Sequence, residues 1–326
     1  MKSKMLVITL EMVIIGLLLI GSGASLAFDE DVLSRGNHLF SAAPRRVNGV
    51  DYGPFRDGQR PGGPCPSLRQ IRKDMKILKH MANAVRTYGL VDCGLGEKFL
   101  LAAKRARVKL LLGMWLSDDE GVNAQEIEEL GRLRAQGLRR VIGLVVGSEV
   151  LWRGDLTMNR LIEYINQVRG MVPEIPVTTA EPWHIWAGLD NRYPDPTPLV
   201  EAVDFIFPNI HPYWEGICLD QAVNAVFERL GIVQEAYPAK KAVISETGWP
   251  TNGEPSGCAI PSPRNQRRFL KRFLCRAQKA KIDFYYFEGF DEKWKAPPEV
   301  EAHWGFYDSD RTPKHPFDTL RRCPKR

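Results

Sequence analysis

The sequence predicts an α/β protein folded as a single (β/α)8 barrel, the TIM barrel. Eight short apolar runs rich in β-branched residues recur along the chain, and amphipathic helix patterns separate them. The hydrophobicity within each run is continuous, which is typical of parallel strands buried on both faces. The length of 326 residues would also allow two domains of about 150 residues. No linker-like or low-complexity stretch divides the chain, so one barrel is the better interpretation.

The predicted strands are residues 47–52, 84–88, 109–115, 141–147, 175–180, 205–210, 241–246 and 283–287. The first helix should begin after Ser67, because Gln70 three residues later completes a capping-box pattern. Further apolar stripes predict helices around residues 99–106, 127–133, 162–168, 223–230 and 264–281.

The first residues have the layout of a signal peptide. Lys2 and Lys4 precede the apolar stretch 12–20, and Ser25 and Ala27 supply the small residues that a signal peptidase reads. We therefore expect a signal peptide at residues 1–27 and a catalytic domain at 28–326. An uncleaved membrane anchor at residues 5–27 is the alternative, although Glu11 leaves the run short of about 20 apolar residues. Either way the protein should be secreted, periplasmic or in the cell envelope.

The composition is that of an ordinary globular protein, with 44% hydrophobic and 26% charged residues and a formal charge of +6. It excludes a disordered chain, a collagen-like repeat and a multi-span membrane protein. Much of the basic excess lies in the helix predicted at 264–281. A solvated outer face explains this charge run better than contact with an acidic polymer or anionic lipid. No nucleic-acid-binding motif accompanies it, so we expect no nucleic-acid partner.

Two glutamates end predicted strands, where TIM-barrel enzymes place their active sites. Glu149 follows the fourth strand and Glu246 ends the seventh. A carboxylate on a buried strand is costly unless it is paired or used. Either glutamate alone could cap a helix or pair with an arginine. Together at one rim they favour a catalytic pair.

Aromatic residues also gather at or beyond the strand ends: Tyr52, Tyr88, Trp115, Trp183, Tyr213, Trp214, Trp249 and Trp294. Some must be packing residues. A groove of such rings would bind the apolar faces of sugars, and two carboxylates beside it are what cleavage of a glycosidic bond requires.

Six motifs give the chain a family resemblance. They are DYGPF at 51–55, VRTY at 85–88, VGSEVL at 146–151, IHPYW at 210–214, ETGWP at 246–250 and FEGFDEKWK at 287–295. In this order, spread over the whole barrel, they resemble glycoside hydrolase family 17, and its bacterial and fungal branch most.

The resemblance implies a retaining enzyme that acts on β-1,3-glucan, as a hydrolase or a transglycosylase. It implies Glu149 as the general acid/base and Glu246 as the nucleophile, with carboxyl groups about 5–5.5 Å apart. Tyr213 would donate a hydrogen bond to Glu246 and keep it ionised. Other substrate-binding positions are Tyr52, Arg86, Tyr88, Asn209, Trp249, Glu292 and Lys295, although Arg86 could serve only as the buried partner of a carboxylate.

Ser148 departs from the family pattern, which usually has asparagine before the acid/base. A serine hydroxyl is shorter and carries one donor hydrogen, so it would reach the sugar 2-hydroxyl only through water. We expect a reduced rate or an altered subsite preference, and expect Ser148→Asn to raise the rate.

The six cysteines allow fifteen pairings from the sequence alone. Positions in the barrel favour Cys65–Cys93, Cys218–Cys258 and Cys275–Cys323, because each pair would lie on neighbouring loops or beside the C-terminal tail. Free buried thiols are the alternative, disfavoured in an exported chain.

The histidines are scattered without metal-ligand spacing, and there is no phosphate loop or dinucleotide motif, so we expect no metal and no cofactor. His211 should shape the site through a hydrogen bond. We expect a monomer whose partner is a β-glucan chain. Three hypotheses stay open: a β-1,3-glucan hydrolase, a transglycosylase with the same glutamates, and a non-catalytic glucan-binding envelope protein.

Overall fold

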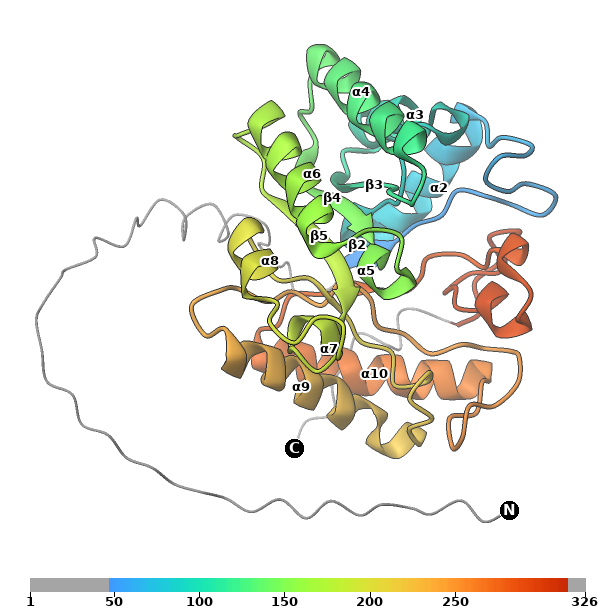
Figure 1. Ribbon diagram of the computed structural model, residues 1–326. Coiled ribbons are helices and arrows are strands. Elements are labelled where there is room, and N and C mark those ends of the chain that lie inside the picture. Colours follow the sequence, from blue (N-terminus) through green and yellow to red (C-terminus); the bar gives the residue numbers. More distant parts are fainter. Residues whose placement is uncertain (1–46, 316–326) are drawn as a thin grey trace, which may run out of the picture.

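Parallel strands curl into a barrel at the centre of the computed structural model, which describes residues 47–315 (Figure 1). The described strands form one sheet in the order β6-β5-β4-β3-β2-β1-β7. They are β1 (Val47–Asp51), β2 (Ala82–Arg86), β3 (Lys109–Met114), β4 (Val141–Ser148), β5 (Val177–Pro182), β6 (Pro208–Asn209) and β7 (Tyr285–Tyr286). The predicted signal segment lies outside the described residues.

Segment 241–246 closes the barrel between β6 and β7. Parallel bridges join Asn209 to Glu246 on one side and Ile244 to Phe284 on the other. The segment is too irregular to form a continuous strand, yet it occupies the seventh of the eight predicted positions. The single-domain TIM barrel is thereby confirmed.

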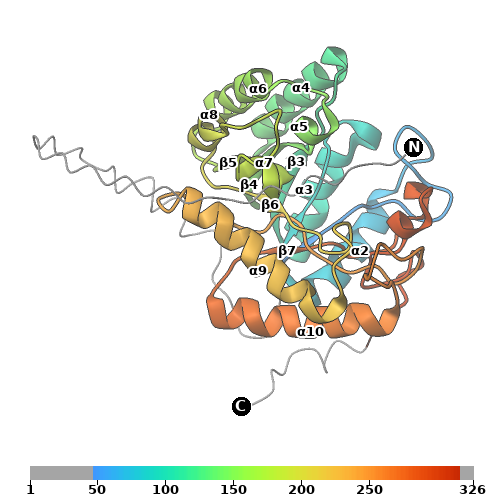
Figure 2. The ribbon, with the colours of Figure 1, turned by 60° about the horizontal axis from the view of Figure 1, so that its bottom comes forward.

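Helices surround the sheet. They are α2 (Leu68–Met81), α3 (Leu95–Ala106), α4 (Glu120–Gln136), α5 (Val150–Arg153), α6 (Met158–Met171), α7 (Trp183–Trp186), α8 (Thr197–Ala202), α9 (Leu219–Ala236) and α10 (Pro263–Ala280). Short 3-10 turns are η1 (Asp92–Gly94), η2 (Lys293–Lys295) and η3 (Glu299–Ala302). Figures 1 and 2 both show α9 and α10 side by side. No helix within residues 47–315 combines the length and apolar character needed to cross a membrane.

The alternation of side chains along the strands creates two separate cores. One cluster fills the barrel itself and includes Ala84, Leu111, Val145 and Tyr285 from four different strands. A much larger cluster lies between the sheet and the helices. Gly49 in β1 makes room for Tyr285, because a Cβ there would lie 2.2 Å from the tyrosine ring. The barrel is therefore a packed core with its opening at the strand ends.

The first helix begins where the sequence predicts. Ser67 is its N-cap and accepts a hydrogen bond from the N–H of Gln70 at 3.2 Å. The capping box is only half formed, however. The side chain of Gln70 donates instead to the carbonyl of Pro54 at 3.1 Å and to Gln59 at 2.7 Å, because the loop after β1 folds over the helix start.

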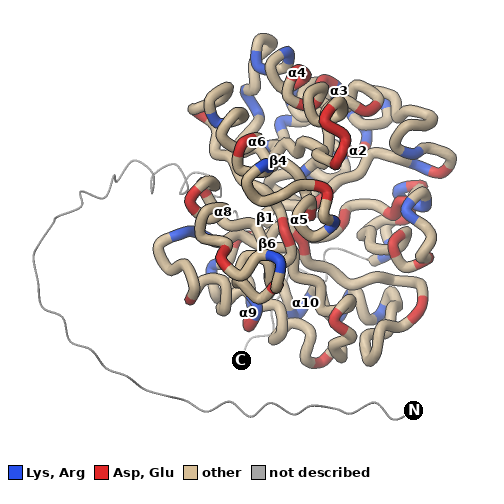
Figure 3. Tube along the Cα trace, in the orientation of Figure 1, with Lys and Arg blue, Asp and Glu red and all other residues tan. Residues whose placement is uncertain are grey.

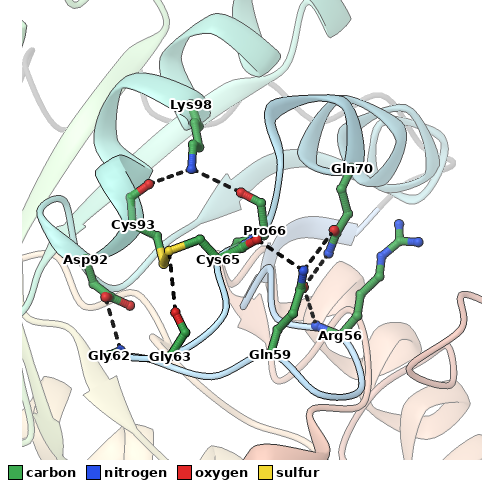
Figure 4. Close-up of a disulfide and its surroundings, with 10 residues drawn as sticks. All are labelled: Arg56, Gln59, Gly62, Gly63, Cys65, Pro66, Gln70, Asp92, Cys93 and Lys98. Atoms are coloured by element: carbon green, nitrogen blue, oxygen red, sulfur yellow. Dashed lines mark hydrogen bonds between the residues drawn. A yellow bond between two sulfur atoms is a disulfide. The ribbon is translucent and has the colours of Figure 1, made fainter.

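Two of the three predicted disulfides are confirmed, Cys65–Cys93 and Cys218–Cys258. Figure 4 shows the first, where Lys98 donates to the carbonyls of Pro66 and Cys93 at 3.1 and 2.6 Å. Cys323 lies outside the described residues, so its pairing with Cys275 stays a prediction. Disulfides persist in oxidising compartments, which agrees with an exported protein.

The basic face of α10 is exposed and is joined to α9 by ion pairs and a hydrogen bond. Arg268 and Arg272 pair with Asp220 at 3.2 and 2.6 Å, and Arg276 donates to Asn224. These contacts fit the interpretation of a solvated outer face.

Candidate active site

Glu149 stands at the end of β4 in a left-handed backbone conformation, with φ 58° and ψ 25°. Its N–H donates to the carbonyl of Ala180 in β5 at 2.7 Å. Its Oε1 accepts a hydrogen bond from Nδ2 of Asn209 at 2.7 Å, and Oδ1 of Asn209 accepts one from Ser245 at 2.5 Å. The end of β5 thus fixes the backbone of Glu149, and Asn209 in β6 binds its carboxyl group.

Burial raises the pKa of Glu149, and the negative charge of Glu246 raises it further. The hydrogen bond from Asn209 opposes these effects without cancelling them. A carboxyl group with a raised pKa retains its proton at higher pH, so Glu149 is suited to act as an acid.

Glu246 is surrounded by donors. Its Oε1 accepts from Nη1 of Arg86 at 2.6 Å and from the hydroxyl of Tyr88 at 3.1 Å, and Nε2 of His211 lies 3.3 Å from Oε2. Burial would raise the pKa of this carboxyl group, but Arg86 and His211 outweigh burial and lower it to about 2. Glu246 is therefore ionised throughout the physiological range.

The pKa values of the two glutamates are therefore shifted in opposite directions, although both side chains line the same cleft. Environments that drive the pKa values of two carboxyl groups apart assign one as acid and the other as base or nucleophile. Figure 3 shows acidic positions at the centre of the view, between α5 and β6.

Arg86 links side chains from several strands beneath the cleft. Besides Glu246 it contacts Oδ1 of Asp51 at 3.5 Å, the carbonyl of Ser245 at 3.2 Å and Oγ of Ser148 at 3.0 Å. Arg86 and Asp51 are fully buried, and Ser148 is 8% exposed. Arg86 is thus a fully buried partner of the Glu246 carboxylate, as the alternative to a substrate-binding role supposed.

Both glutamates line one cleft with a volume of about 500 Å³. Its wall carries the aromatic rings of Trp152, Trp183, Trp214 and Phe287. The other lining residues are Pro182, His184, Asn209, His211, Glu215 and Glu301. Aromatic faces beside paired carboxyl groups suit a carbohydrate chain.

Comparison with known proteins agrees with this geometry. A family model described as the BtgE/BtgC glycoside hydrolase domain matches residues 49–305. The chain belongs to glycoside hydrolase family 17. It is therefore a glycoside hydrolase.

Two curated relatives of this family 17 enzyme are named glucan 1,3-beta-glucosidase. The one from Arthroderma benhamiae is 33% identical, covering 80% of this chain and 88% of the relative. The one from Schizosaccharomyces pombe is 32% identical, covering 78% and 82%. Among solved structures, a family 17 beta-1,3-glucanosyltransferase from Rhizomucor miehei superposes with a TM-score of 0.74 at 33% identity, covering 84% of this chain and 97% of that one.

One predicted contact in the family 17 site is wrong. The hydroxyl of Tyr213 does not donate to Glu246; it donates to the backbone carbonyl of Glu254. The phenol hydroxyl has one hydrogen to give, and the buried ring of Tyr213 packs edge-on against Trp249 and Trp304. Tyr88 supplies the hydrogen bond to Glu246 instead.

Two predicted binding residues lie in the core, out of reach of a substrate. Tyr52 is fully buried and donates to Asp74 at 3.0 Å. Trp249 is also fully buried and donates from Nε1 to the carbonyl of Ile260 at 3.0 Å. Both lie at or just beyond the end of a predicted strand, but their side chains point into the layer between barrel and helices.

Glu292 and Lys295 form a buried ion cluster beside the cleft. Nζ of Lys295 lies 2.8 Å from Oε2 of Glu288 and 2.9 Å from Oε2 of Glu292. The same ammonium group is 4.7 Å from the ring centre of Phe287, which lines the cleft. These two residues therefore support the cleft wall from behind.

The sequence did not single out Trp152, His184, Phe287, Glu215 and Glu301 as binding residues. Phe287 could have been found, because it ends the eighth predicted strand. Trp152 offered a weaker signal, three residues beyond Glu149. The others lie on helices and loops whose direction no strand pattern predicts.

Proposed function

We propose that this family 17 enzyme is a retaining glycosidase that cleaves β-1,3-glucan, with Glu149 as acid/base and Glu246 as nucleophile. The proposal is carried by two carboxyl groups in one aromatic-lined cleft whose surroundings shift their pKa values in opposite directions. The substrate class is supported by the names of the relatives from Arthroderma benhamiae and Schizosaccharomyces pombe.

In the first step Glu149 donates its proton to the glycosidic oxygen as the bond from that oxygen to C1 breaks. The ionised carboxylate of Glu246 attacks C1 from the opposite face and forms a glycosyl ester. The short ion pair with Arg86 and the hydrogen bond from Tyr88 keep Glu246 ionised and fix the oxygen that they both contact.

In the second step Glu149, now ionised, removes a proton from water, and the water oxygen attacks C1 to release Glu246. Asn209 supports this change of role, because its N–H group donates to the carboxylate form of Glu149. Two inversions at C1 leave the product with the configuration of the substrate.

A transglycosylase is the second candidate, favoured by the 33% identity to the beta-1,3-glucanosyltransferase from Rhizomucor miehei. Transfer shares the first step and replaces water with a hydroxyl group of another glucan chain. Incubation with laminari-oligosaccharides of defined length separates the two candidates. Products longer than the substrate require transfer, whereas only shorter products indicate hydrolysis.

The third hypothesis, a non-catalytic glucan-binding protein, disagrees with a chain that belongs to the glycoside hydrolases. A protein that only binds glucan would have no use for two carboxyl groups with oppositely shifted pKa values. Loss of turnover in the Glu246→Ala variant would support the enzymatic mechanism, whereas turnover equal to that of the unchanged enzyme would overturn Glu246 as the nucleophile.

We further propose that the enzyme acts outside the cytoplasm. The signal-peptide pattern at residues 1–27 and the two disulfides support this location.

A further inference from the structure

Glu181 is a buried carboxylate that the mechanism above does not use. It lies near the end of β5 and is fully buried. Its Oε1 accepts the N–H of Leu151 at 2.9 Å, and its Oε2 accepts the N–H of Trp152 at 3.2 Å. Both donors belong to α5, the four-residue helix that follows Glu149.

β5 therefore holds the chain around the acid/base at three backbone N–H groups. The carbonyl of Ala180 accepts the N–H of Glu149 itself, and the carboxyl group of Glu181 accepts the N–H groups of Leu151 and Trp152 in α5. Glu149 needs such a constraint, because a left-handed backbone is unfavourable for a residue with a side chain. The position of the Glu149 carboxyl group therefore depends on how firmly this backbone is held.

A second buried carboxylate elsewhere in the barrel provides a matched comparison. Glu126 in α4 is 2% exposed and accepts the N–H groups of Leu90, Val91 and Trp115 at 3.0–3.3 Å. Burial raises the pKa of Glu126 to about 7 and that of Glu181 to about 8. None of the three residues whose N–H groups Glu126 accepts lines the cleft. Glu126 therefore joins loops without contacting the residues of the cleft.

We propose that Glu181 is a positioning residue for the acid/base: by holding the start of α5 against β5, it fixes the direction in which Glu149 presents its proton. The inference rests on the proposed function, because it requires that Glu149 protonates a leaving group.

The test compares Glu181→Gln with Glu126→Gln on two substrates. Glutamine keeps one acceptor but turns an NH2 group toward the second backbone N–H, so the first turn of α5 must shift. Laminari-oligosaccharides need protonation of the leaving oxygen, whereas a 2,4-dinitrophenyl β-glucoside does not, because dinitrophenolate is a stable anion. The value of kcat/KM reports bond cleavage for both substrates.

For Glu181→Gln we expect kcat/KM on the oligosaccharide to fall by about tenfold to 100-fold, the range that a misplaced catalytic group costs. On the dinitrophenyl glucoside it should stay within about twofold. Glu126→Gln should lose thermal stability while retaining kcat/KM on both substrates.

Equal losses on both substrates, or no loss on either, would overturn the inference. If Glu181→Gln does not fold, Glu181→Asp answers the same question, because the shorter side chain keeps a carboxyl group that cannot reach both N–H groups. If the unchanged enzyme fails to cleave laminari-oligosaccharides, the proposed function fails first, so the two failures are distinguishable.

Discussion

Replacement of Tyr88 by phenylalanine should move the acidic limb of the pH–rate profile. The variant removes one hydrogen bond, at 3.1 Å, to Oε1 of Glu246 and leaves the ion pair with Arg86 in place. A hydrogen bond to a charged group contributes about 1.5–3 kcal/mol, and one pKa unit corresponds to about 1.4 kcal/mol. The pKa of Glu246, about 2 in the unchanged enzyme, should therefore rise by about one to two units.

The sign follows from the form that reacts. Glu246 attacks as an anion, so a higher pKa moves the loss of activity at low pH to a higher pH. The value of kcat/KM should be measured on laminari-oligosaccharides from about pH 3 to pH 8. Over this range the unchanged enzyme should lose little activity, because the pKa of Glu246 is about 2, whereas Tyr88→Phe should lose activity as the pH falls toward about 3–4. At neutral pH Arg86 still keeps the carboxylate ionised, so activity should fall by only about tenfold, the equivalent of 1.4 kcal/mol.

Tyr213→Phe is the matched control, because its hydroxyl donates to the carbonyl of Glu254. This variant should leave the acidic limb unchanged. The reasoning is refuted if Tyr213→Phe moves the limb as far as Tyr88→Phe, or if Tyr88→Phe does not move it.

Three further outcomes are expected. Glu149→Gln should lower turnover of laminari-oligosaccharides by about 10²–10⁴-fold. It should also raise the melting temperature at pH 8, because the raised pKa of Glu149 means that its ionised form destabilises the fold. At pH 3.5 the melting temperature should not rise, and an equal rise at both pH values would contradict this reasoning. Asn209→Ala should move the alkaline limb of kcat/KM to higher pH, since the lost hydrogen bond favours the ionised form of Glu149; a shift to lower pH would contradict it. The double variant Cys218→Ala/Cys258→Ala should lose about 4 kcal/mol of unfolding free energy by denaturant titration, given the 40-residue separation, and unchanged stability would count against the disulfide.

The barrel was predictable from the sequence, and so was the meeting of Glu149 and Glu246 in one cleft. Continuous apolar runs mark parallel strands, and the fold gathers their carboxyl ends at one rim, so Glu149, Glu246 and Asn209 meet there. The two disulfides followed from the same rule, since loops after neighbouring strands lie together.

The direction of individual aromatic side chains was not predictable. Side chains alternate along a strand, so a residue directly after an inward-pointing one faces the helices. Asp51 contacts Arg86 inside the barrel, and Tyr52 therefore packs outside against Phe99 and Phe290.

Loop residues pose a harder problem. Tyr88 and Tyr213 both follow predicted strands, and only the path of each loop decides which hydroxyl reaches Glu246. Trp152 enters the cleft because α5 turns back over β5, an arrangement set by Glu181 and Arg153 rather than by a repeating pattern.

Covalent trapping of the nucleophile tests the mechanism most directly. A 2-deoxy-2-fluoro-β-laminaribiosyl fluoride should form a glycosyl ester that hydrolyses slowly, because fluorine destabilises the positive charge that develops at C1. Mass spectrometry of the digested protein should find the disaccharide on the peptide that contains Glu246, and the Glu246→Ala variant should remain unlabelled. A label on any other residue, or release of the inverted product by an active enzyme that never forms the ester, would contradict Glu246 as the nucleophile of a retaining glycosidase.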